Sequence, residues 1–186
     1  MSVIAANPAP RRSPFWRAVI SGTGIVALIY VLLYALYAFW QPDALSVYTF
    51  TDLVNNSTPL ALAAAGETLV VISRGFDLSV AGVVSLTNVL MAVYPLDGPG
   101  GALVSLLMCC AIGAFVGMIN GILVAKLGLQ TIAATLGTMI VCQGLALVIL
   151  DAPGGMVADF VTYTLTDTLF GVVPIAGLFL VAAVVL

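Results

Sequence analysis

The feature that most constrains this chain is a succession of long apolar runs with very few charges between them. Only 7% of the residues are Asp, Glu, Lys or Arg, whereas a soluble domain carries about 25%. A chain of this kind has too few charged residues to cover itself with a water-facing surface, so it must fold in a lipid bilayer. The apolar runs are continuous instead of alternating with period two, which favours helices as the spanning elements. The sequence therefore predicts an all-α polytopic integral membrane protein.

The runs predict about five complete transmembrane helices and a truncated sixth. At 1.5 Å per residue, a run of about 20 residues spans about 30 Å, which is one hydrocarbon thickness. The last run, 172–186, is shorter than this, and we expect a truncated chain. The stretch 151–167 before it is expected to be a loop. In order, the expected runs are 19–39, 53–72, 78–94, 102–124, 129–150 and from 169 onward.

Two domains of unequal size are expected, a short cytoplasmic tail at 1–17 and a transmembrane domain at 18–186 that is incomplete at its C-terminus. In the second apolar run, Pro59 predicts a kink or a break, because proline lacks a backbone donor. Asp77 precedes the third run, where its carboxylate is expected to cap the helix by accepting the amide of Val80.

The positions of the charges predict the orientation of the chain. With alternating crossings and a cytoplasmic N-terminus, every basic residue falls at a cytoplasmic end, as the positive-inside rule requires. These residues are Arg11, Arg12, Arg17, Arg74 and Lys126. The opposite end then receives Asp43, Asp52, Asp97, Asp151, Asp159 and Asp167.

Three charges stand close together in residues 66–80, and they are Glu67, Arg74 and Asp77. A charge in the bilayer core costs about 2.5–3.5 kcal/mol, so a retained charge usually has a partner or a function. Arg74 and Asp77 also fit a point where two membrane helices simply reach water. Glu67 fits three roles, a buried partner for Arg74, a protonated neutral acid or a conformational latch. Our hypothesis is that the three residues fix the junction between the second and third helices.

Small residues recur on the fourth run, where Gly113, Gly117 and Gly121 lie near one face and predict close packing of a neighbouring helix. The sequence has no histidine, and its three cysteines all lie in apolar runs, where we interpret them as small buried hydrophobes. We therefore expect no metal site and no cofactor. A net charge of −3 argues against nucleic-acid binding. No nucleophile with a base and no Gly-rich phosphate loop is evident, so an enzyme is not expected.

Several short motifs follow one another in a specific order within residues 53–150. They are Gly66-Glu-Thr-Leu-Val-Val-Ile72, Gly75-Phe-Asp-Leu-Ser79 with Gly82, Gly113-x3-Gly117-x2-Asn120-Gly121-x4-Lys126, and Thr135-Leu-Gly-Thr-Met139 followed by Gly144-Leu-Ala146. Together they resemble the inner-membrane permease subunits of ribose-type ATP-binding-cassette (ABC) importers, which take up monosaccharides. Gln130 and Gln143 depart from the proline and the arginine that are frequent in that family.

The resemblance implies a transport subunit of the bacterial inner membrane that does no covalent chemistry. Its expected partners are separate ABC ATPase subunits, a periplasmic or lipid-anchored sugar-binding protein and a second permease copy, identical or related. The family's second half carries the cytoplasmic coupling segment that meets the ATPase, and we expect this chain to lack it.

Transport of a neutral, hydroxyl-rich sugar requires hydrogen-bonding groups along the pathway. The candidates in the membrane runs are Asn55, Asn56, Ser57, Thr68, Ser85, Asn88, Asn120 and Thr135. Hydrogen bonds between helices, worth about 0.6 kcal/mol each on average, are the alternative for any one of them.

Three other functions stay open at this point. An ATP-independent transporter or channel would use Glu67 as a proton-relay carboxylate. A truncated relic or membrane scaffold would transport nothing. An ABC permease could also carry another small solute, such as a branched-chain amino acid, a nucleoside or a urea-like molecule.

Overall fold

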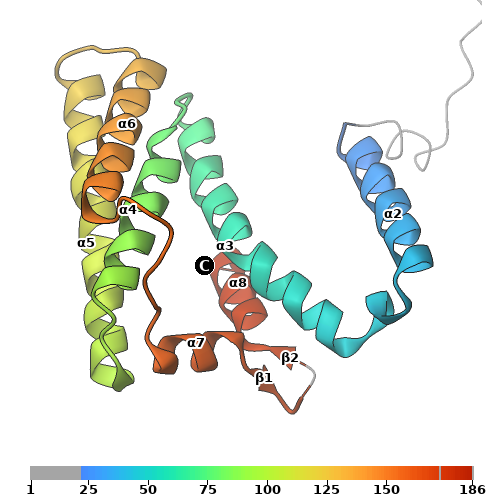
Figure 1. Cartoon of the computed structure of the whole chain (residues 1–186). Coiled ribbons are helices and arrows are strands. Elements are labelled where there is room, and N and C mark those ends of the chain that lie inside the picture. The colour runs from blue at the N-terminus through green and yellow to red at the C-terminus, as the bar shows by residue number, and fades with distance from the viewer. Residues whose placement is uncertain (1–21, 172, 186) are drawn as a thin grey trace, which may run out of the picture. The chain divides into compact units, whose positions relative to one another are not determined.

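The computed structural model describes residues 22–171 and 173–185, and most of them are helical (Figure 1). The chain divides into two compact units, residues 1–50 and 51–186. In chain order the elements are α2 (Gly22–Trp40), η1 (Pro42–Leu45), α3 (Val47–Ile72), α4 (Ser79–Val93), α5 (Gly98–Ala125), α6 (Thr131–Ile149), α7 (Asp159–Thr166), β1 (Thr168–Leu169), β2 (Val173–Pro174) and α8 (Ile175–Val185).

The predicted helical class is confirmed, and the helices follow the apolar runs. Two of the described helices, α5 and α6, are both long and apolar enough to cross a bilayer, while α2 and α4 are apolar but shorter. Helix α3 has 26 residues but is less apolar. The number of crossings therefore stays a prediction. The tail at 1–17 lies outside the described residues, as do the start of the first run and the very end of the last one.

Two expectations near the C-terminus are wrong. The stretch 151–167 is not only a loop, because its second half forms the short helix α7. The sixth run does not begin as a helix at Leu169, because this residue lies in β1 and pairs with Val173 of β2. Each of these antiparallel strands has two residues, and α8 begins only at Ile175.

In the first unit, the C-terminal half of α2 is hydrogen-bonded to the following 3-10 helix η1. The hydroxyl of Tyr34 donates to the carbonyl oxygen of Ala44 at 2.7 Å, and Ala44 is buried. Tyr34 also stacks on Tyr30, with 6.3 Å between the ring centroids. The aromatic residues at this end of the first run thus stabilise the local fold.

The α3 helix continues through Pro59 without a break, and its ribbon changes direction partway along (Figure 1). Proline removes one helical hydrogen bond and crowds the preceding turn, so bending is the expected result. Nearby hydroxyls bond to their own helix, since Ser57 donates to the carbonyl of Leu53 and Thr58 to that of Val54.

In the second unit, α4, α5 and α6 lie side by side (Figure 1). Their small core consists of Leu86, Val116, Cys142 and Ala146. Helix α4 approaches α6 closely at Gly82, where an added Cβ would lie 2.7 Å from the carbonyl oxygen of Met139. Since that atom is backbone, the helices could not stay this close with any larger residue at position 82.

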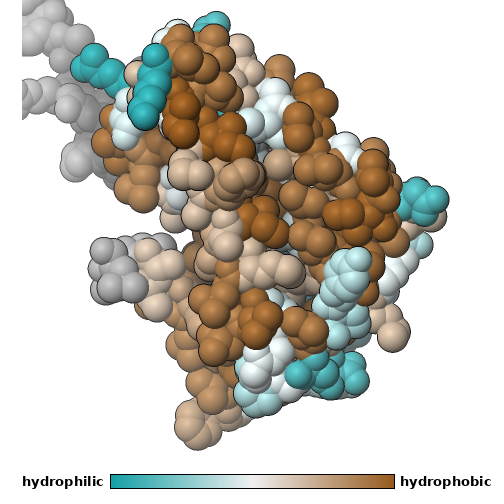
Figure 2. All heavy atoms as spheres, turned by 90° about the vertical axis from the view of Figure 1, so that its left-hand side faces the viewer, coloured by the Kyte–Doolittle hydropathy of each residue, from teal (hydrophilic) through white to brown (hydrophobic). Residues whose placement is uncertain are grey.

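Most large apolar side chains point outward. Leu107 on α5 is 60% exposed and Val148 on α6 is 82% exposed, and hydrophobic residues dominate the face that Figure 2 shows. Exposed apolar surface of this extent is expected of a protein solvated by lipid. The prediction of buried cysteines is confirmed for Cys142, whereas Cys109 is half-buried and Cys110 exposed.

Candidate functional site

The candidate site is built around the turn between α3 and α4, in the second unit. The turn closes through backbone hydrogen bonds, with the amide of Arg74 donating to Val71 O at 2.9 Å and the amide of Gly75 donating to Val70 O at 3.0 Å. Arg74 has a φ of 62°, in the left-handed region. Gly75 is buried, and its position faces Thr131 at the start of α6. The reversal of the chain is therefore packed directly against α6.

Asp77 holds the beginning of α4, although not in the way the sequence predicts. Its Oδ1 atom accepts the amide of Ser79 at 2.8 Å and the hydroxyl of Ser79 at 2.5 Å. The predicted bond from the amide of Val80 is wrong, because Leu78 occupies the N-cap position and Asp77 lies one residue before it. The carboxylate still satisfies a free amide in the first turn of the helix.

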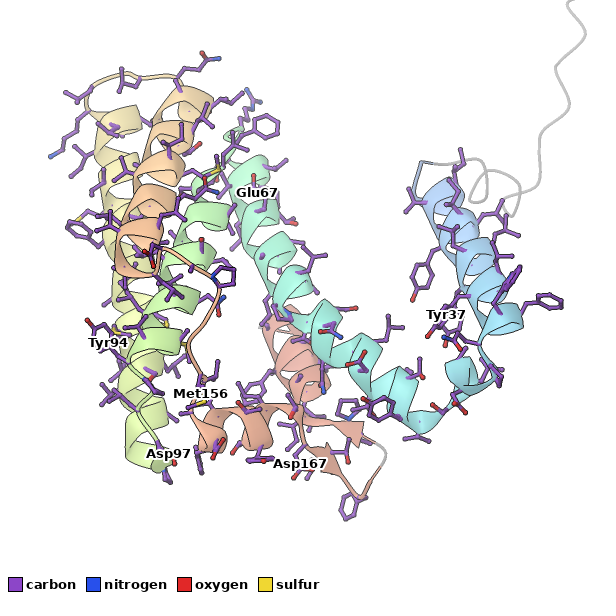
Figure 3. All side chains as sticks on the ribbon, viewed as in Figure 1. Tyr37, Glu67, Tyr94, Asp97, Met156 and Asp167 are labelled. Carbon is purple, nitrogen blue, oxygen red and sulfur yellow. The ribbon has the colours of Figure 1, made fainter. Side chains whose placement is uncertain are left out.

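Glu67 joins this arrangement from α3, where it lies near the turn (Figure 3). Its Oε1 atom accepts the backbone amide of Asp77 at 3.2 Å. Its Oε2 atom is buried and has no hydrogen-bond partner among the described residues. The Glu67 side chain thus bonds to the backbone of Asp77 and not to the Asp77 carboxylate.

Arg74 stands apart from the two carboxylates. No ion pair is present in the described part of the chain, and the Arg74 side chain is exposed. The Glu67–Arg74 pairing considered from the sequence is not found in this structure. Whether the three charged residues together fix the junction stays a prediction.

Asn120 of α5 extends the network to two further helices. It is buried, and its Nδ2 atom donates to the Oγ of Ser79 at 2.9 Å. Its Oδ1 atom accepts the hydroxyl of Thr138 on α6 at 2.8 Å. The Ser79 hydroxyl therefore donates to Asp77 and accepts from Asn120, which makes it the central member of the chain of hydrogen bonds.

Thr135 provides a second link to α6. Its buried hydroxyl accepts the amide of Leu78 at 3.1 Å and donates to the carbonyl oxygen of Thr131 at 2.9 Å. Four helices thus meet in one polar junction, which consists of Glu67, Asp77, Ser79, Asn120, Thr135 and Thr138. Ser79 and Thr138 are site residues that the sequence does not predict, although both lie inside the quoted motifs.

The other predicted pathway residues lie elsewhere. Asn55 on α3 donates from Nδ2 to the carbonyl oxygen of Thr166 at the end of α7, at 3.3 Å, and its buried Oδ1 atom has no partner in the described residues. Asn56 and Asn88 are exposed, and Ser85 is half-buried on α4. Their contact with a solute stays a prediction.

The glycine stripe on α5 is largely open. An added Cβ at Gly113 would lie 3.9 Å from Val83, and at Gly117 and Gly121 it would have nothing within 4 Å. No helix of the described chain packs closely on this face, so the predicted helix contact there is untested. Close packing of α4 on α6 is permitted instead by Gly82.

At the opposite end of the second unit, Asp97 caps two helices. Its Oδ1 atom accepts the amide of Gly98 at the start of α5, at 2.9 Å, and the amide of Phe160 in α7, at 3.0 Å. These two donors, Phe160 first, lower the pKa of Asp97 from its ordinary value. Met156, in the segment between α6 and α7, donates its amide to Ala92 of α4. Figure 3 labels Asp97 and Met156 at this end.

A groove of about 580 Å³ runs between α5 and α6, with Leu86 of α4 among its lining residues. The lining is apolar except for Thr138 and includes Met108, Phe115 and Val141. It offers almost no hydrogen-bonding groups to a polar solute. No cluster of potential metal-binding residues occurs within 22–171 and 173–185.

Comparison with known proteins identifies related membrane proteins. The sequence profile of the family described as "Branched-chain amino acid transport system / permease component" matches residues 49–186. The chain is 33% identical over 159 residues to the autoinducer 2 import system permease protein LsrC of Yersinia pseudotuberculosis serotype O:3 (strain YPIII) and to that of Yersinia pestis (strain Pestoides F). Each match covers 84% of this chain and 44% of the relative, so the chain spans less than half the length of these relatives. No solved structure matches.

Proposed function

Because this chain belongs to the family of the branched-chain amino acid transport system permease component, we propose that it is part of the membrane subunit of an ABC importer for a monosaccharide or a related hydroxylated solute. The observation that carries this proposal is the family match over residues 49–186, together with the similarity to permeases of the autoinducer 2 import system. The motifs at 66–82, 113–126 and 135–146 support the sugar class, because they resemble ribose-type permeases.

The mechanism is solute passage without covalent chemistry. Two permease copies, identical or related, form the pathway between them and expose it alternately to either side of the inner membrane. A binding protein delivers the solute from outside, and ATPase subunits inside supply the energy. In this scheme the subunit itself binds no nucleotide and is not an enzyme.

The proposed orientation has the N-terminus in the cytoplasm and about five complete crossings within this chain. The placement of the charges supports it. Arg74 and Lys126 lie in the turns after α3 and after α5, and both turns lie at the same end of the helices in Figure 1. Asp97 and Asp159 lie at the other helix ends. By the positive-inside rule, the end with Arg74 and Lys126 is cytoplasmic.

The proposed role of the polar junction is to keep the α3–α4 turn attached to α5 and α6 while the helices rearrange during transport. Hydrogen bonds support this role, because the junction links these helices through Asn120 and Thr135. Both polar atoms of the Asn120 amide are already bonded, which favours a structural role for this residue over solute contact.

The test is uptake by cells that carry the complete transport system. A strain lacking the gene, and the same strain complemented with it, are supplied with radiolabelled ribose, autoinducer 2 or leucine. Uptake of ribose that needs both the gene and an intact ATPase subunit supports the proposal. Uptake of leucine alone overturns the sugar class. Uptake that survives loss of the ATPase but stops with a protonophore indicates an ATP-independent transporter.

Autoinducer 2 is the second candidate solute, because the matched relatives are named as permeases of its import system. The same strains distinguish the two solutes. Gene-dependent uptake of autoinducer 2 without uptake of ribose assigns this solute to the chain and corrects the ribose proposal.

A further inference from the structure

Three buried side-chain oxygens have no hydrogen-bond partner within residues 22–171 and 173–185, and all three belong to α3. They are Thr51 Oγ1, Asn55 Oδ1 and Glu67 Oε2. Buried polar side-chain atoms in folded proteins are nearly always paired, so each exception needs an explanation. All three exceptions thus lie on one helix, where the other described residues leave hydrogen-bonding capacity unused.

Three other hydroxyls of α3 bond to the backbone of their own helix, while that of Thr49 donates to the carbonyl oxygen of Asp43 at 2.8 Å. Ser57, Thr58 and Thr68 each donate to the carbonyl oxygen four residues earlier, at 2.6, 2.8 and 2.7 Å. Such bonds allow a hydroxyl to stand in an apolar environment without any partner from outside. Thr51, on the same helix, has no such bond, so its hydroxyl differs from theirs.

The chemistry of the three atoms restricts what can pair with them. The Nδ2 group of Asn55 already donates to Thr166 O, so its unpaired atom is a carbonyl oxygen, which only accepts. The Oε1 atom of Glu67 already accepts the amide of Asp77, and the second oxygen of a carboxylate is likewise a hydrogen-bond acceptor. The Thr51 hydroxyl accepts and donates. A partner that presents hydrogen-bond donors therefore matches all three positions.

We propose that α3 lines the solute pathway and that Thr51, Asn55 and Glu67, whose unpaired oxygens are covered in this conformation, accept hydrogen bonds from hydroxyl groups of the solute when the helices rearrange during transport. This inference rests on the proposed function and narrows it to one helix. Thr51 and Asn55 are one turn apart and form one binding position. Glu67 is twelve residues after Asn55, about 18 Å along the helix axis, and forms a second position.

The polarity of α3 agrees with this placement. Helix α3 is less apolar than α6, although its 26 residues exceed the 19 of α6. A membrane helix with this many polar groups is expected to face a pathway or cavity and not the lipid. The proposed positions also select against one class of solute, because the free carboxylate of an amino acid would meet acceptors at Asn55 and Glu67.

The test compares two identical chemical changes on the same helix. Thr51→Val removes the unpaired hydroxyl, and Thr68→Val removes a hydroxyl that is bonded to its own backbone. Each variant is placed in the complete importer, and uptake of ribose and of its monodeoxy derivatives is measured together with the amount of protein in the membrane. We expect Thr51→Val to lower ribose uptake about 3- to 10-fold, the equivalent of one hydrogen bond. Thr68→Val is expected to leave uptake unchanged, because the Thr68 hydroxyl, a pathway candidate from the sequence, donates to the carbonyl oxygen of Ala64 in its own helix.

The deoxy sugars separate solute contact from a structural role. If Thr51 binds one solute hydroxyl, the derivative lacking that hydroxyl is transported equally well by the wild type and by Thr51→Val. A uniform loss for every sugar overturns the inference, and so does an unchanged ribose uptake. Thr51→Ser keeps the hydroxyl and is expected to retain uptake. Loss in this variant, with normal protein in the membrane, also overturns the inference.

Failure of the proposed function gives a different result. A wild-type importer that takes up no ribose, hexose or autoinducer 2 overturns the function and this inference with it. Normal uptake by the wild type with unaffected Thr51→Val and Glu67→Gln variants overturns only the assignment of α3 to the pathway.

Discussion

Replacing Asn120 by alanine tests whether the polar junction holds the second unit together. Asn120 is 6% exposed, and its amide group bonds to Ser79 and Thr138 at 2.9 and 2.8 Å. Asn120→Ala removes both bonds at once. The Ser79 hydroxyl then loses the bond that it accepts from Asn120, while it continues to donate to Asp77.

The expected cost follows from these contacts. Side-chain hydrogen bonds between membrane helices contribute about 0.6 kcal/mol on average and about 1.7 kcal/mol at most. The Thr138 hydroxyl can turn toward the carbonyl oxygen of Thr135, which lies 3.0 Å away, so part of the loss at Thr138 is recovered. We expect Asn120→Ala to lower the free energy of unfolding by about 1–2 kcal/mol.

The assay is reversible unfolding of the purified protein by SDS in mixed micelles, followed by circular dichroism. Asn88→Ala is the matched control, because Asn88 is an exposed asparagine on α4, and its change is expected to stay within about 0.5 kcal/mol. A double-mutant cycle of Asn120→Ala with Ser79→Ala isolates their bond, with an expected coupling energy of about 0.6–1.7 kcal/mol. A coupling energy of zero, or equal losses for Asn88→Ala and Asn120→Ala, refutes the structural role of the junction.

Three further outcomes are expected. Gly82→Ala places a Cβ 2.7 Å from the backbone of α6 and should lower the free energy of unfolding by about 1–3 kcal/mol. Gly117→Ala is the control, because its Cβ would have nothing within 4 Å, and it should not lower this free energy. Equal effects of the two variants on unfolding in SDS would contradict the packing described. The pKa of Asp97 is lowered in the folded state, so its hydrogen bonds contribute fully to stability when the pH is above the ordinary carboxyl pKa of 3.8. This contribution is lost as the pH falls through the lower pKa of the folded state. Protease cleavage between α6 and α7 should therefore rise at low pH, and Asp97→Asn should remove this pH dependence; cleavage that does not change with pH would count against it. Cysteines placed at Lys126 and Asp159 should react with an impermeant maleimide from the cytoplasmic and the outer side respectively, and the reverse pattern would invert the proposed orientation.

The sequence predicts the helices well where hydrophobicity alone decides them. The run expected at 129–150 becomes α6 at Thr131–Ile149, and the run at 102–124 becomes α5 at Gly98–Ala125. The extra turn of α5 comes from its cap, because Asp97 bonds to the amide of Gly98. Helix α7 is missed because its eight residues are half threonine or acid and carry no long apolar run.

The site is predicted less completely, because its members meet only through the fold. Glu67 and Asp77 attract attention as charges in an apolar sequence, and both belong to the junction. Ser79 and Thr138 are ordinary hydroxyl residues in sequence, and only the packing of α4, α5 and α6 against one another shows their role. The Asp77 cap is misplaced by one residue for a similar reason, since Leu78 takes the N-cap position while its amide bonds to Thr135 of α6.

The attachment of α4 has a consequence for how the protein is made. With 15 residues, α4 is about 22 Å long, shorter than the hydrocarbon core. Two hydrogen bonds hold the beginning of α4. Asn120 bonds to Ser79 and lies 41 residues after it in the chain, and Thr135 bonds to Leu78 and lies 57 residues after it. During synthesis α4 therefore leaves the ribosome before the residues that secure it exist. Its final position in the bilayer is reached only after α5 and α6 have been inserted, so the order of translation and the order of assembly differ in this part of the protein.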